Sequence, residues 1–351
     1  MSGFQRATLE RRPRERRPGP RRALVTGGCG FIGSYLCREL LGTGREVCAF
    51  DVREFAPEGR YVLGDLVDQV RIERGSVDDD RRIFDLVGAF DPDEIVHLAA
   101  VLDPGALVRN RRTAVRVNFD SVVTLLETML VFGVERLVNF SSIGVLPRVQ
   151  YEPIDSNHPV LLAGSGPGTD FYGAAKVAAE AFCFAYQQAL GLDFRTIRPS
   201  AVYGLGMNPY PGPIKAMVEG AARGESVHFP TGGAHPRSYT HAEDIAGLVR
   251  AMLDAPDGAD RIFYGATGEP LVTTTEVASL VREVVPGADV SIGEELADAE
   301  RSVAAMRGQL SIENARTQLG WEPRYRDLRA GIAHYVEEVR GFLAQNPREK
   351  A

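Results

Sequence analysis

The chain carries at residues 23–33 the stretch Ala23-Leu24-Val25-Thr26-Gly27-Gly28-Cys29-Gly30-Phe31-Ile32-Gly33, and this stretch decides the fold. Apolar residues, a cluster of glycines and further apolar residues at helical spacing predict a strand, a tight turn and a helix. Glycines spaced in this way suit a dinucleotide site, because they allow the turn, the close approach of backbone to a pyrophosphate, and tight helix–strand packing. The start of the helix offers free N–H groups to the phosphates. The cofactor-binding candidates in the stretch are Gly27, Gly30, Phe31, Ile32 and Gly33.

A second apolar run, Glu46-Val47-Cys48-Ala49-Phe50, ends in Asp51. An acid about 20 residues after the glycine turn is placed to bind the ribose hydroxyls of a dinucleotide. Because a carboxylate repels a 2′-phosphate, Asp51 favours NAD over NADP. Arg53 lies close enough in the sequence to leave NADP open as an alternative.

The composition limits the classes of protein to which this chain can belong. The 351 residues are 44% hydrophobic and 25% charged, which is ordinary for a globular protein with a large core. A net charge of −7 argues against nucleic acid or an anionic membrane surface as a partner. The four cysteines show neither C-x-x-C spacing nor a histidine cluster, so no metal site is expected and a reduced, cytoplasmic setting is favoured. No apolar run reaches the ~18 residues of a membrane span.

The chain divides into segments of different character. Residues 1–22 are basic and proline-rich and lack a periodic apolar face, which predicts a disordered tail. A dinucleotide-binding domain is expected over 23–200, with 236–266 returning to it. The remaining segments, 201–235 and 267–345, are expected to form a substrate-binding lobe.

Apolar runs and helical segments alternate along the chain. The runs predict buried parallel strands, which are apolar almost throughout. The alternation predicts the α/β class: a Rossmann-type, right-handed, doubly wound parallel sheet with a smaller C-terminal lobe. Further strands are expected at 70–77, 94–100, 136–142, 194–199 and 261–266, and helices at 79–90, 112–132, 171–188 and 214–223.

Several residues at strand ends are candidates for contact with the cofactor. Ser76 and Val77 lie where a third strand could reach the adenine, although Ser76 fits equally well as a helix cap. Leu98-Ala99-Ala100 ends the fourth strand in small residues that let a cofactor pass closely. His97 in the same strand fits a hydrogen-bonded core histidine better than a catalytic one. The proline- and glycine-rich connection 143–170 is long enough to suggest a functional lid.

Three side chains suit acid–base chemistry. Tyr172 and Lys176 are four residues apart on a predicted helix and therefore share a face. A lysine ammonium stabilises a tyrosine phenolate, whose parent phenol has a pKa of ~10 when free. Ser142 follows a strand and would face the same crevice. The alternatives are a surface pair for Tyr172 and Lys176, and a turn cap for Ser142.

The motifs together resemble the extended short-chain dehydrogenase/reductases of the NAD-dependent epimerase/dehydratase type. The resemblance covers residues 23 to about 340, and no single motif is specific. Besides the glycine stretch, it rests on His97-Leu98-Ala99-Ala100, Ser141-Ser142-Ile143-Gly144-Val145, Tyr172-Gly173-Ala174-Ala175-Lys176, Arg198-Pro199-Ser200-Ala201-Val202-Tyr203-Gly204 and Arg237-Ser238-Tyr239-Thr240-His241.

The resemblance implies a role for each matched residue. Tyr172 would exchange a proton with the substrate, Lys176 would hold the nicotinamide ribose and tune Tyr172, and Ser142 would hydrogen-bond the substrate oxygen. Asn118 would support the site through the backbone or a water. Arg237 matches a position that holds a diphosphate in sugar-nucleotide relatives, with a salt bridge between the lobes as the alternative. Pro199 is a further cofactor-binding candidate, and Tyr203 a further substrate-binding candidate.

Three departures from the family pattern reduce the number of reactions that are expected. Ile143 and Gly144 replace the Asp-Glu pair with which 4,6-dehydratases eliminate water, so dehydration is not expected. Ala201 stands where many sugar-nucleotide epimerases carry asparagine, which weakens the case for a nucleotide sugar. Asp170-Phe171 replaces the usual residues before the catalytic tyrosine.

Three functions remain open. The first is an NAD-dependent oxidoreductase or epimerase that transfers a hydride at a secondary hydroxyl or ketone of a sugar-like or small hydroxylated substrate. The second is a nucleotide-sugar 4-epimerase with retained NAD, and the third a noncatalytic NAD-sensing regulator. A homodimer through the helices near 112–132 and 171–188 is an expectation from the family.

Overall fold

The computed structural model describes residues 18–146, 148–160, 170–208 and 212–347. The predicted tail therefore lies outside the described residues, except for its last five. Of these, Arg22 already begins the first strand, and Arg21 forms an ion pair with Glu94 at 3.1 Å. The ordered domain thus starts slightly before the predicted residue 23.

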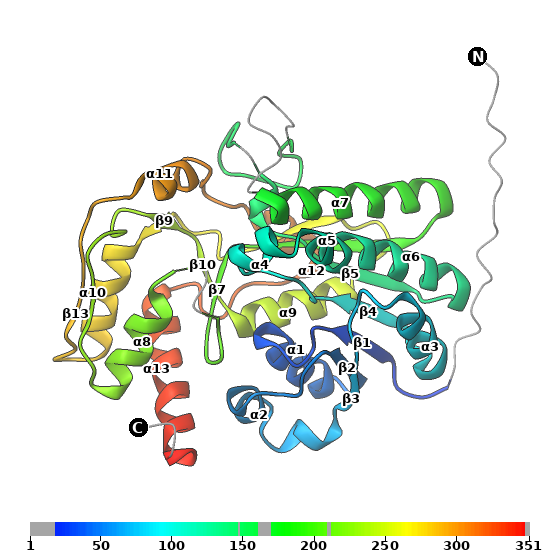
Figure 1. Ribbon diagram of the computed structural model, residues 1–351, viewed down its shortest axis with the longest axis horizontal. Coiled ribbons are helices and arrows are strands. Elements are labelled where there is room, and N and C mark those ends of the chain that lie inside the picture. Colours follow the sequence, from blue (N-terminus) through cyan, green and yellow to red (C-terminus); the bar gives the residue numbers. More distant parts are fainter. Residues whose placement is uncertain (1–17, 147, 161–169, 209–211, 348–351) are drawn as a thin grey trace.

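A seven-stranded parallel sheet forms the centre of the protein (Figure 1). Its strand order is β11-β6-β5-β4-β1-β2-β3, so the direction of winding reverses between β1 and β4. In such sheets ligands bind beyond the carboxyl ends of the strands at this reversal. The strand bounds are β1 Arg22–Thr26, β2 Glu46–Asp51, β3 Arg71–Arg74, β4 Glu94–His97, β5 Arg136–Phe140, β6 Asp193–Pro199 and β11 Ile262–Gly265.

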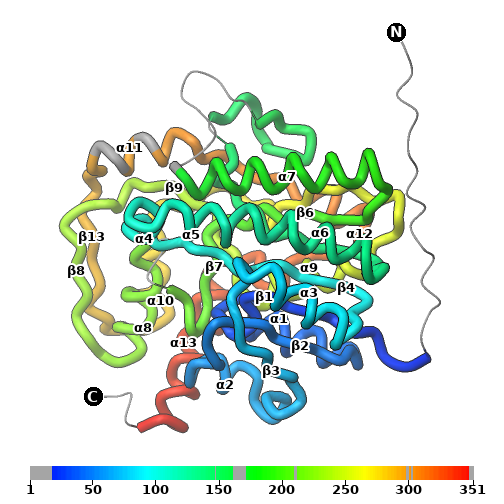
Figure 2. Tube along the Cα trace, turned by 45° about the vertical axis from the view of Figure 1, so that its right-hand side comes forward, coloured from blue at the N-terminus to red at the C-terminus, as the bar shows by residue number. Residues whose placement is uncertain are grey.

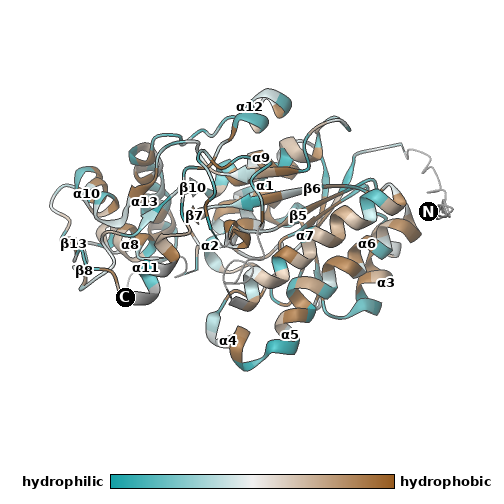
Figure 3. Cartoon of the chain, turned by 90° about the horizontal axis from the view of Figure 1, so that it is seen from above, coloured by the Kyte–Doolittle hydropathy of each residue, from teal (hydrophilic) through white to brown (hydrophobic). Residues whose placement is uncertain are grey.

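Helices cover both faces of the sheet, as the Rossmann prediction requires (Figure 3). The two faces bury separate apolar clusters, and the apolar run of each strand supplies side chains to both. One face carries α1 (Phe31–Gly42), α2 (Pro57–Leu63) and α9 (Ala242–Leu253); the other carries α3 (Asp80–Phe90), α6 (Ser121–Phe132) and α7 (Asp170–Leu190).

The predicted helix over 112–132 is not continuous. The structure has α5 (Arg111–Val115), a π-helical turn η2 (Arg116–Asp120), and then α6. A π-turn holds one residue more than an α-turn, and such turns are frequent at functional sites. Asn118 lies at the centre of this turn and is fully buried.

A second lobe is formed mainly by residues after β7 (Ala201–Tyr203). Figure 2 shows β8 and β13 at its outer edge, far from the central sheet. Three small two-stranded sheets accompany its helices. Its elements are α8 (Ile214–Arg223), β8 (Val227–Phe229), β9 (Pro236–Arg237), β10 (Tyr239–His241), β12 (Val272–Thr273), α10 (Thr274–Val284), β13 (Val290–Ile292), α11 (Asp298–Ala304) and α13 (Leu328–Gln345); α4 (Pro104–Arg109) and α12 (Glu313–Leu319) complete the chain.

One polar row crosses the central sheet in register. Thr26, His97, Asn139 and Thr196 are successive partners on β1, β4, β5 and β6. All four are fully buried. Since in-register residues of parallel strands point to the same face, the row lies beneath the helices that include α6 and α7.

Candidate active site

The glycine turn leaves no room for side chains. A Cβ on Gly27, whose φ is +69°, would lie 2.8 Å from the backbone nitrogen of Ala99, and one on Gly28 would lie 2.7 Å from the Cβ of Ala49. A Cβ on Gly33 would collide with the carbonyl oxygen of Gly28. The turn is thus a backbone-lined cradle at the reversal point of the sheet, and its shape fits a dinucleotide pyrophosphate.

Asp51 lies beside this cradle, as predicted. Its carboxylate accepts the backbone N–H groups of Cys29 and Arg53, each at 3.2 Å. Phe31 and Ile32 begin α1, and Gly30 at its N-cap has no side chain to occupy the free N–H groups. An anion at this helix start would therefore meet backbone donors only.

The other predicted cofactor contacts lie around the same edge. Leu98-Ala99-Ala100 follows β4 and is half-buried against the glycine turn, while Val77 is buried and Ser76 half-buried after β3. The alternative role of Ser76 as a helix cap is wrong, because the side chain of Asp79 caps α3. Pro199 ends β6 and is half-buried.

His97 and Asn118 are structural in different ways. His97 shares hydrogen bonds with Thr26 at 2.7 Å and Ser121 at 3.1 Å. Burial, followed by the charge of Lys176, lowers the pKa of His97 to about 3, so the ring is neutral and its core assignment is confirmed. Asn118 accepts the N–H of Val101 at 2.7 Å and donates to its carbonyl at 3.0 Å, which ties η2 to the segment after β4.

Lys176 is buried at the carboxyl end of β5. Its Nζ donates to the carbonyl of Phe140 at 2.6 Å and lies 5.7 Å from the ring centroid of Tyr172. Only 1% of the residue is exposed, and burial lowers its pKa to about 8. An ammonium held in this way can stabilise a phenolate on Tyr172 and donate to ribose hydroxyls.

Ser142 lies next to the same helix. It follows β5 and its Oγ accepts the N–H of Gly144 at 2.9 Å, so it caps the 3₁₀ turn η3 (Ile143–Val145). This turn packs against α7, which carries Tyr172. The segments of Ser142, Tyr172 and Lys176 are thereby neighbours at one edge of the sheet, while the catalytic roles of these residues stay a prediction.

Tyr203 does not fit its predicted substrate contact. The side chain is fully buried, and its ring packs against those of Tyr239, His241 and Tyr335. It belongs to the apolar contact between the lobes. The sequence alone could not distinguish this burial from exposure in the crevice, because an irregular loop follows directly.

Arg237 has an unexpected companion. The Nε of Arg237 and the Nη1 of Arg307 are both buried, and neither finds a hydrogen-bond partner in the described part of the chain. Burial lowers the pKa of Arg237, and burial together with the charge of Arg237 lowers that of Arg307 to about 10. Across the described ranges no carboxylate lies within ion-pair distance of either, so the predicted alternative of a salt bridge is not realised. Sequence reasoning missed Arg307, because no local pattern marks it.

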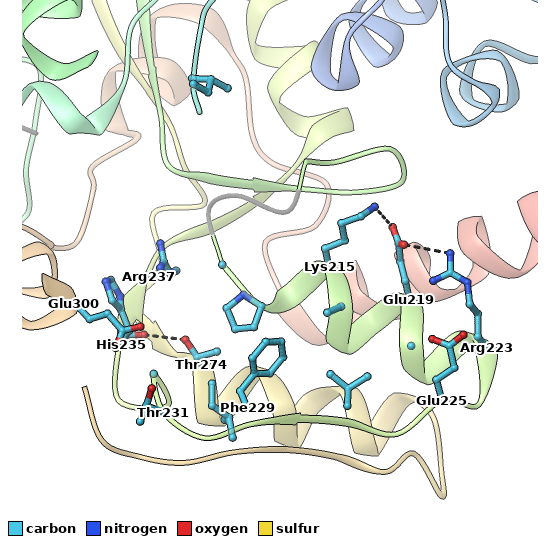
Figure 4. A pocket seen from close by; sticks show the side chains of 18 residues that line it. Lys215, Glu219, Arg223, Glu225, Phe229, Thr231, His235, Arg237, Thr274 and Glu300 are labelled. Atoms are coloured by element: carbon cyan, nitrogen blue, oxygen red, sulfur yellow. Dashed lines mark hydrogen bonds and ion pairs between the residues drawn. The ribbon is translucent and has the colours of Figure 1, made fainter. Parts of the chain in front are cut away.

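A cavity of about 850 Å³ opens beside Arg237 (Figure 4). Arg237 and His235 lie at one end, Lys215 and Arg223 at the other, and Phe229 between them. The lining comes from the second lobe and from Leu102, which follows β4. Ser142, Tyr172 and Lys176 are not part of the lining, so the cavity does not contain the catalytic candidates.

One cluster has the composition of a metal site. His241, His334 and Glu338 bring ligand atoms within 4.8 Å of one another. However, Nδ1 of His241 accepts the N–H of Glu243 at 3.2 Å as the cap of α9, so in the neutral ring Nε2 carries the proton. That nitrogen lies 3.4 Å from a carboxylate oxygen of Glu338, and neither atom forms a hydrogen bond within the described residues. With its proton on Nε2, His241 offers no lone pair to a metal ion.

None of the described helices is long and apolar enough to cross a membrane.

Residues 23–264 match the family model described as "NAD dependent epimerase/dehydratase family". The UDP-glucose 4-epimerase of Mycolicibacterium smegmatis is 29% identical over 91% of this chain and 98% of its own length.

Solved structures give the same result. The Thermus thermophilus UDP-glucose 4-epimerase in complex with NAD superposes with a TM-score of 0.74 and is 26% identical over 91% of this chain and 99% of its own. The protein MoeE5 in complex with UDP-glucuronic acid and NAD reaches 0.72, also at 26% identity, over 91% of this chain and 99% of its own. The predicted resemblance, the Rossmann fold and NAD as the cofactor are confirmed, and the reading as a noncatalytic sensor is set aside. The chain belongs to the NAD-dependent epimerase/dehydratase family, as an enzyme of the extended short-chain dehydrogenase/reductase type.

Proposed function

We propose that this enzyme is a 4-epimerase of nucleoside diphosphate sugars that retains its NAD. The observation that carries the proposal is the pair of unpartnered guanidinium groups of Arg237 and Arg307. Both side chains are half-buried, and Arg307 is repelled by Arg237, whose only carboxylate neighbour of note among the described residues is Glu300, beyond ion-pair distance. Arginine matches phosphate oxygens in charge and in bidentate geometry, so an anionic ligand would supply the missing partner. A diphosphate supplies two phosphates in one ligand.

The cavity supports a nucleotide as the carrier of that diphosphate. Its volume of about 850 Å³ lies within the range of organic ligand sites. Phe229 offers an aromatic face in the lining, on which a base can stack. Ala201, which replaces the asparagine of many sugar-nucleotide epimerases, is a buried residue of β7, and it does not line the cavity.

The reaction divides among three side chains. Bound NAD supplies the hydride chemistry at the sugar carbon. The phenolate of Tyr172 removes the hydroxyl proton of that carbon and later returns it, while Lys176 stabilises the phenolate. Ser142 donates a hydrogen bond to the same oxygen. Ile143 and Gly144 cannot protonate a leaving hydroxyl, which favours epimerisation over dehydration.

The assembly and setting belong to the same proposal. The side chains of Val131 on α6 and of Phe171 and Phe182 on α7 are between 43% and 63% exposed. A second copy packed on α6 and α7 would cover them, giving the expected homodimer. The four cysteines are buried and free, in keeping with a reduced, cytoplasmic setting.

The test combines binding and turnover. Calorimetry should detect UDP binding to the wild type, and R237M and R307M should each weaken it about 10–100-fold, as expected for a lost charged hydrogen bond. R340M, on the exposed face of α13, is the control. Wild-type enzyme should interconvert UDP-glucose and UDP-galactose without net NADH, and Y172F should lose this turnover. Absence of UDP binding, or stoichiometric release of NADH, would refute the proposal.

A further inference from the structure

His235 is a buried polar side chain in the lining of the cavity (Figure 4). Only 3% of the residue is exposed. Its backbone N–H donates to the carbonyl of Gly232 at 3.2 Å, and its carbonyl accepts the N–H and the hydroxyl of Thr274, each at 3.3 Å. The backbone that carries the ring is therefore fixed from both sides.

The hydrogen bond of the ring determines its tautomer. Nδ1 of His235 lies 3.1 Å from the carbonyl oxygen of Pro236. Because a carbonyl can only accept, Nδ1 carries the proton, and Nε2 of the neutral ring has a lone pair. Within the described ranges this is the only hydrogen bond that the ring forms, so the lone pair of Nε2 is not used there.

The surroundings keep the ring neutral. Burial, followed by the charge of Arg237, lowers the pKa of His235 to about 4. The charge of Arg307 adds to this effect, whereas the carbonyl of Pro236 and the carboxylate of Glu300 oppose it. At pH 7 the side chain is therefore a hydrogen-bond acceptor beside Arg237, which can only donate.

Only a donor group of the ligand can satisfy Nε2. The oxygens of a diphosphate held by Arg237 are acceptors and cannot do so. The base belongs on Phe229, further along the cavity, and the reacting sugar must reach Ser142 and Tyr172, which do not line it. The ribose lies between the diphosphate and the base, so its hydroxyl groups are the remaining donors.

We propose that His235 is a specificity-determining residue whose Nε2 accepts a hydrogen bond from the ribose diol of the nucleoside diphosphate. A nucleotide that lacks the bonded hydroxyl would leave this buried lone pair without a donor, and a site built for a hydroxyl discriminates by that penalty. The inference rests on the proposed function and deepens it, because it defines which part of the nucleotide the cavity selects.

The test compares the affinities of the NAD-loaded enzyme for UDP, 2′-deoxy-UDP and 3′-deoxy-UDP by calorimetry. Wild type should bind UDP about 5–20-fold more tightly than one of the two deoxy analogues, as expected when a buried acceptor loses its donor. H235N keeps a donor for the carbonyl of Pro236 but removes the acceptor, so this preference should fall to about twofold or less. H235Q brings an amide oxygen towards the place of Nε2 and should retain most of the preference.

Two further variants complete the design. H228N, at a histidine of β8 whose side chain is 54% exposed, is the matched control and should keep the full preference. H235L removes the acceptor in a different way and replaces H235N if thermal unfolding shows that H235N does not fold.

Equal affinities of wild type for all three nucleotides would overturn the proposal. A folded H235N that keeps the preference would overturn it as well. Glu300 also lines the cavity, and one of its carboxylate oxygens accepts the N–H of Ala297 at 2.8 Å. Loss of the preference in E300Q but not in H235N would therefore assign the hydroxyl to Glu300. A wild type that binds none of the three nucleotides would instead refute the proposed function.

Discussion

Replacing Lys176 by methionine should stabilise the NAD-free protein while removing its activity. Burial lowers the pKa of Lys176 to about 8, from an ordinary 10.5. At 1.36 kcal/mol per pKa unit, keeping this ammonium charged at pH 7 costs the fold roughly 3 kcal/mol. Methionine also leaves the buried carbonyl of Phe140 without its donor, which costs about 2 kcal/mol. K176M is nearly isosteric and should therefore raise the free energy of unfolding by about 1 kcal/mol.

The difference in the free energy of unfolding between K176M and wild type should decrease as the pH rises. Between pH 8 and 10.5 the unfolded lysine is protonated and the folded one is not, so the wild type gains stability as the pH rises. The difference between K176M and wild type should therefore be largest below pH 8 and shrink above it. Lys215 is a matched control, because it is half-exposed and ion-paired with Glu219, so K215M should give no gain.

Urea unfolding of the NAD-free proteins at several pH values measures this difference directly, and equal m-values would show that the unfolded states are comparable. K176M that is less stable than wild type at pH 7, or a gain in stability that is the same at pH 7 and pH 10, would contradict this prediction. Retained epimerase activity in K176M would separately refute the assigned role of Lys176.

Three further predictions concern stability. G33A places a Cβ against the carbonyl of Gly28 and should destabilise the NAD-free protein by about 1–3 kcal/mol, whereas G42A at the open end of the same helix should be neutral or stabilising in thermal unfolding. Neither polar atom of Asn139 has a partner in the described residues, so N139L should raise the stability by about 1 kcal/mol; a loss would reveal a buried water there. Burial would lower the pKa of His334, but its neighbours Glu243 and Glu338 raise it above the usual value. H334Q should therefore destabilise the protein at pH 6, and this effect should fade as the pH rises through the raised pKa, as urea unfolding across pH would show.

The central sheet was predictable because parallel strands that are buried on both faces consist of unbroken runs of apolar residues. The runs around Val25, Phe50 and Val138 all became strands at the expected places, within one or two residues at most ends. The break in the predicted helix over 112–132 was not predictable from the apolar pattern. A π-turn adds one residue without removing the apolar face, and its only trace in the sequence was the polar Asn118 among apolar neighbours.

The candidate site was predictable where its parts are close in sequence. The four-residue spacing of Tyr172 and Lys176 places both on one helical face by geometry alone. The hydrogen bond from the backbone N–H of Gln309, near Arg307, to the carboxylate of Glu152 was not predictable in this way, because the two residues are 157 positions apart. The local sequence of a segment does not indicate which distant segment it will contact. The burial of Tyr203 was not predictable either, because its ring packs against residues of β10 and α13 that are distant in the sequence.

Ser142 shows that a structural and a catalytic role can support each other. Its Oγ accepts the N–H of Gly144, so one lone pair is already used and the side chain is fixed. The hydroxyl proton is not needed for that bond and is available to donate. A donor held by its neighbour, rather than rotating freely, is what stabilisation of a developing charge on the substrate oxygen requires. The cap is therefore compatible with the role proposed for Ser142, and a capping serine in this position is no argument against that role.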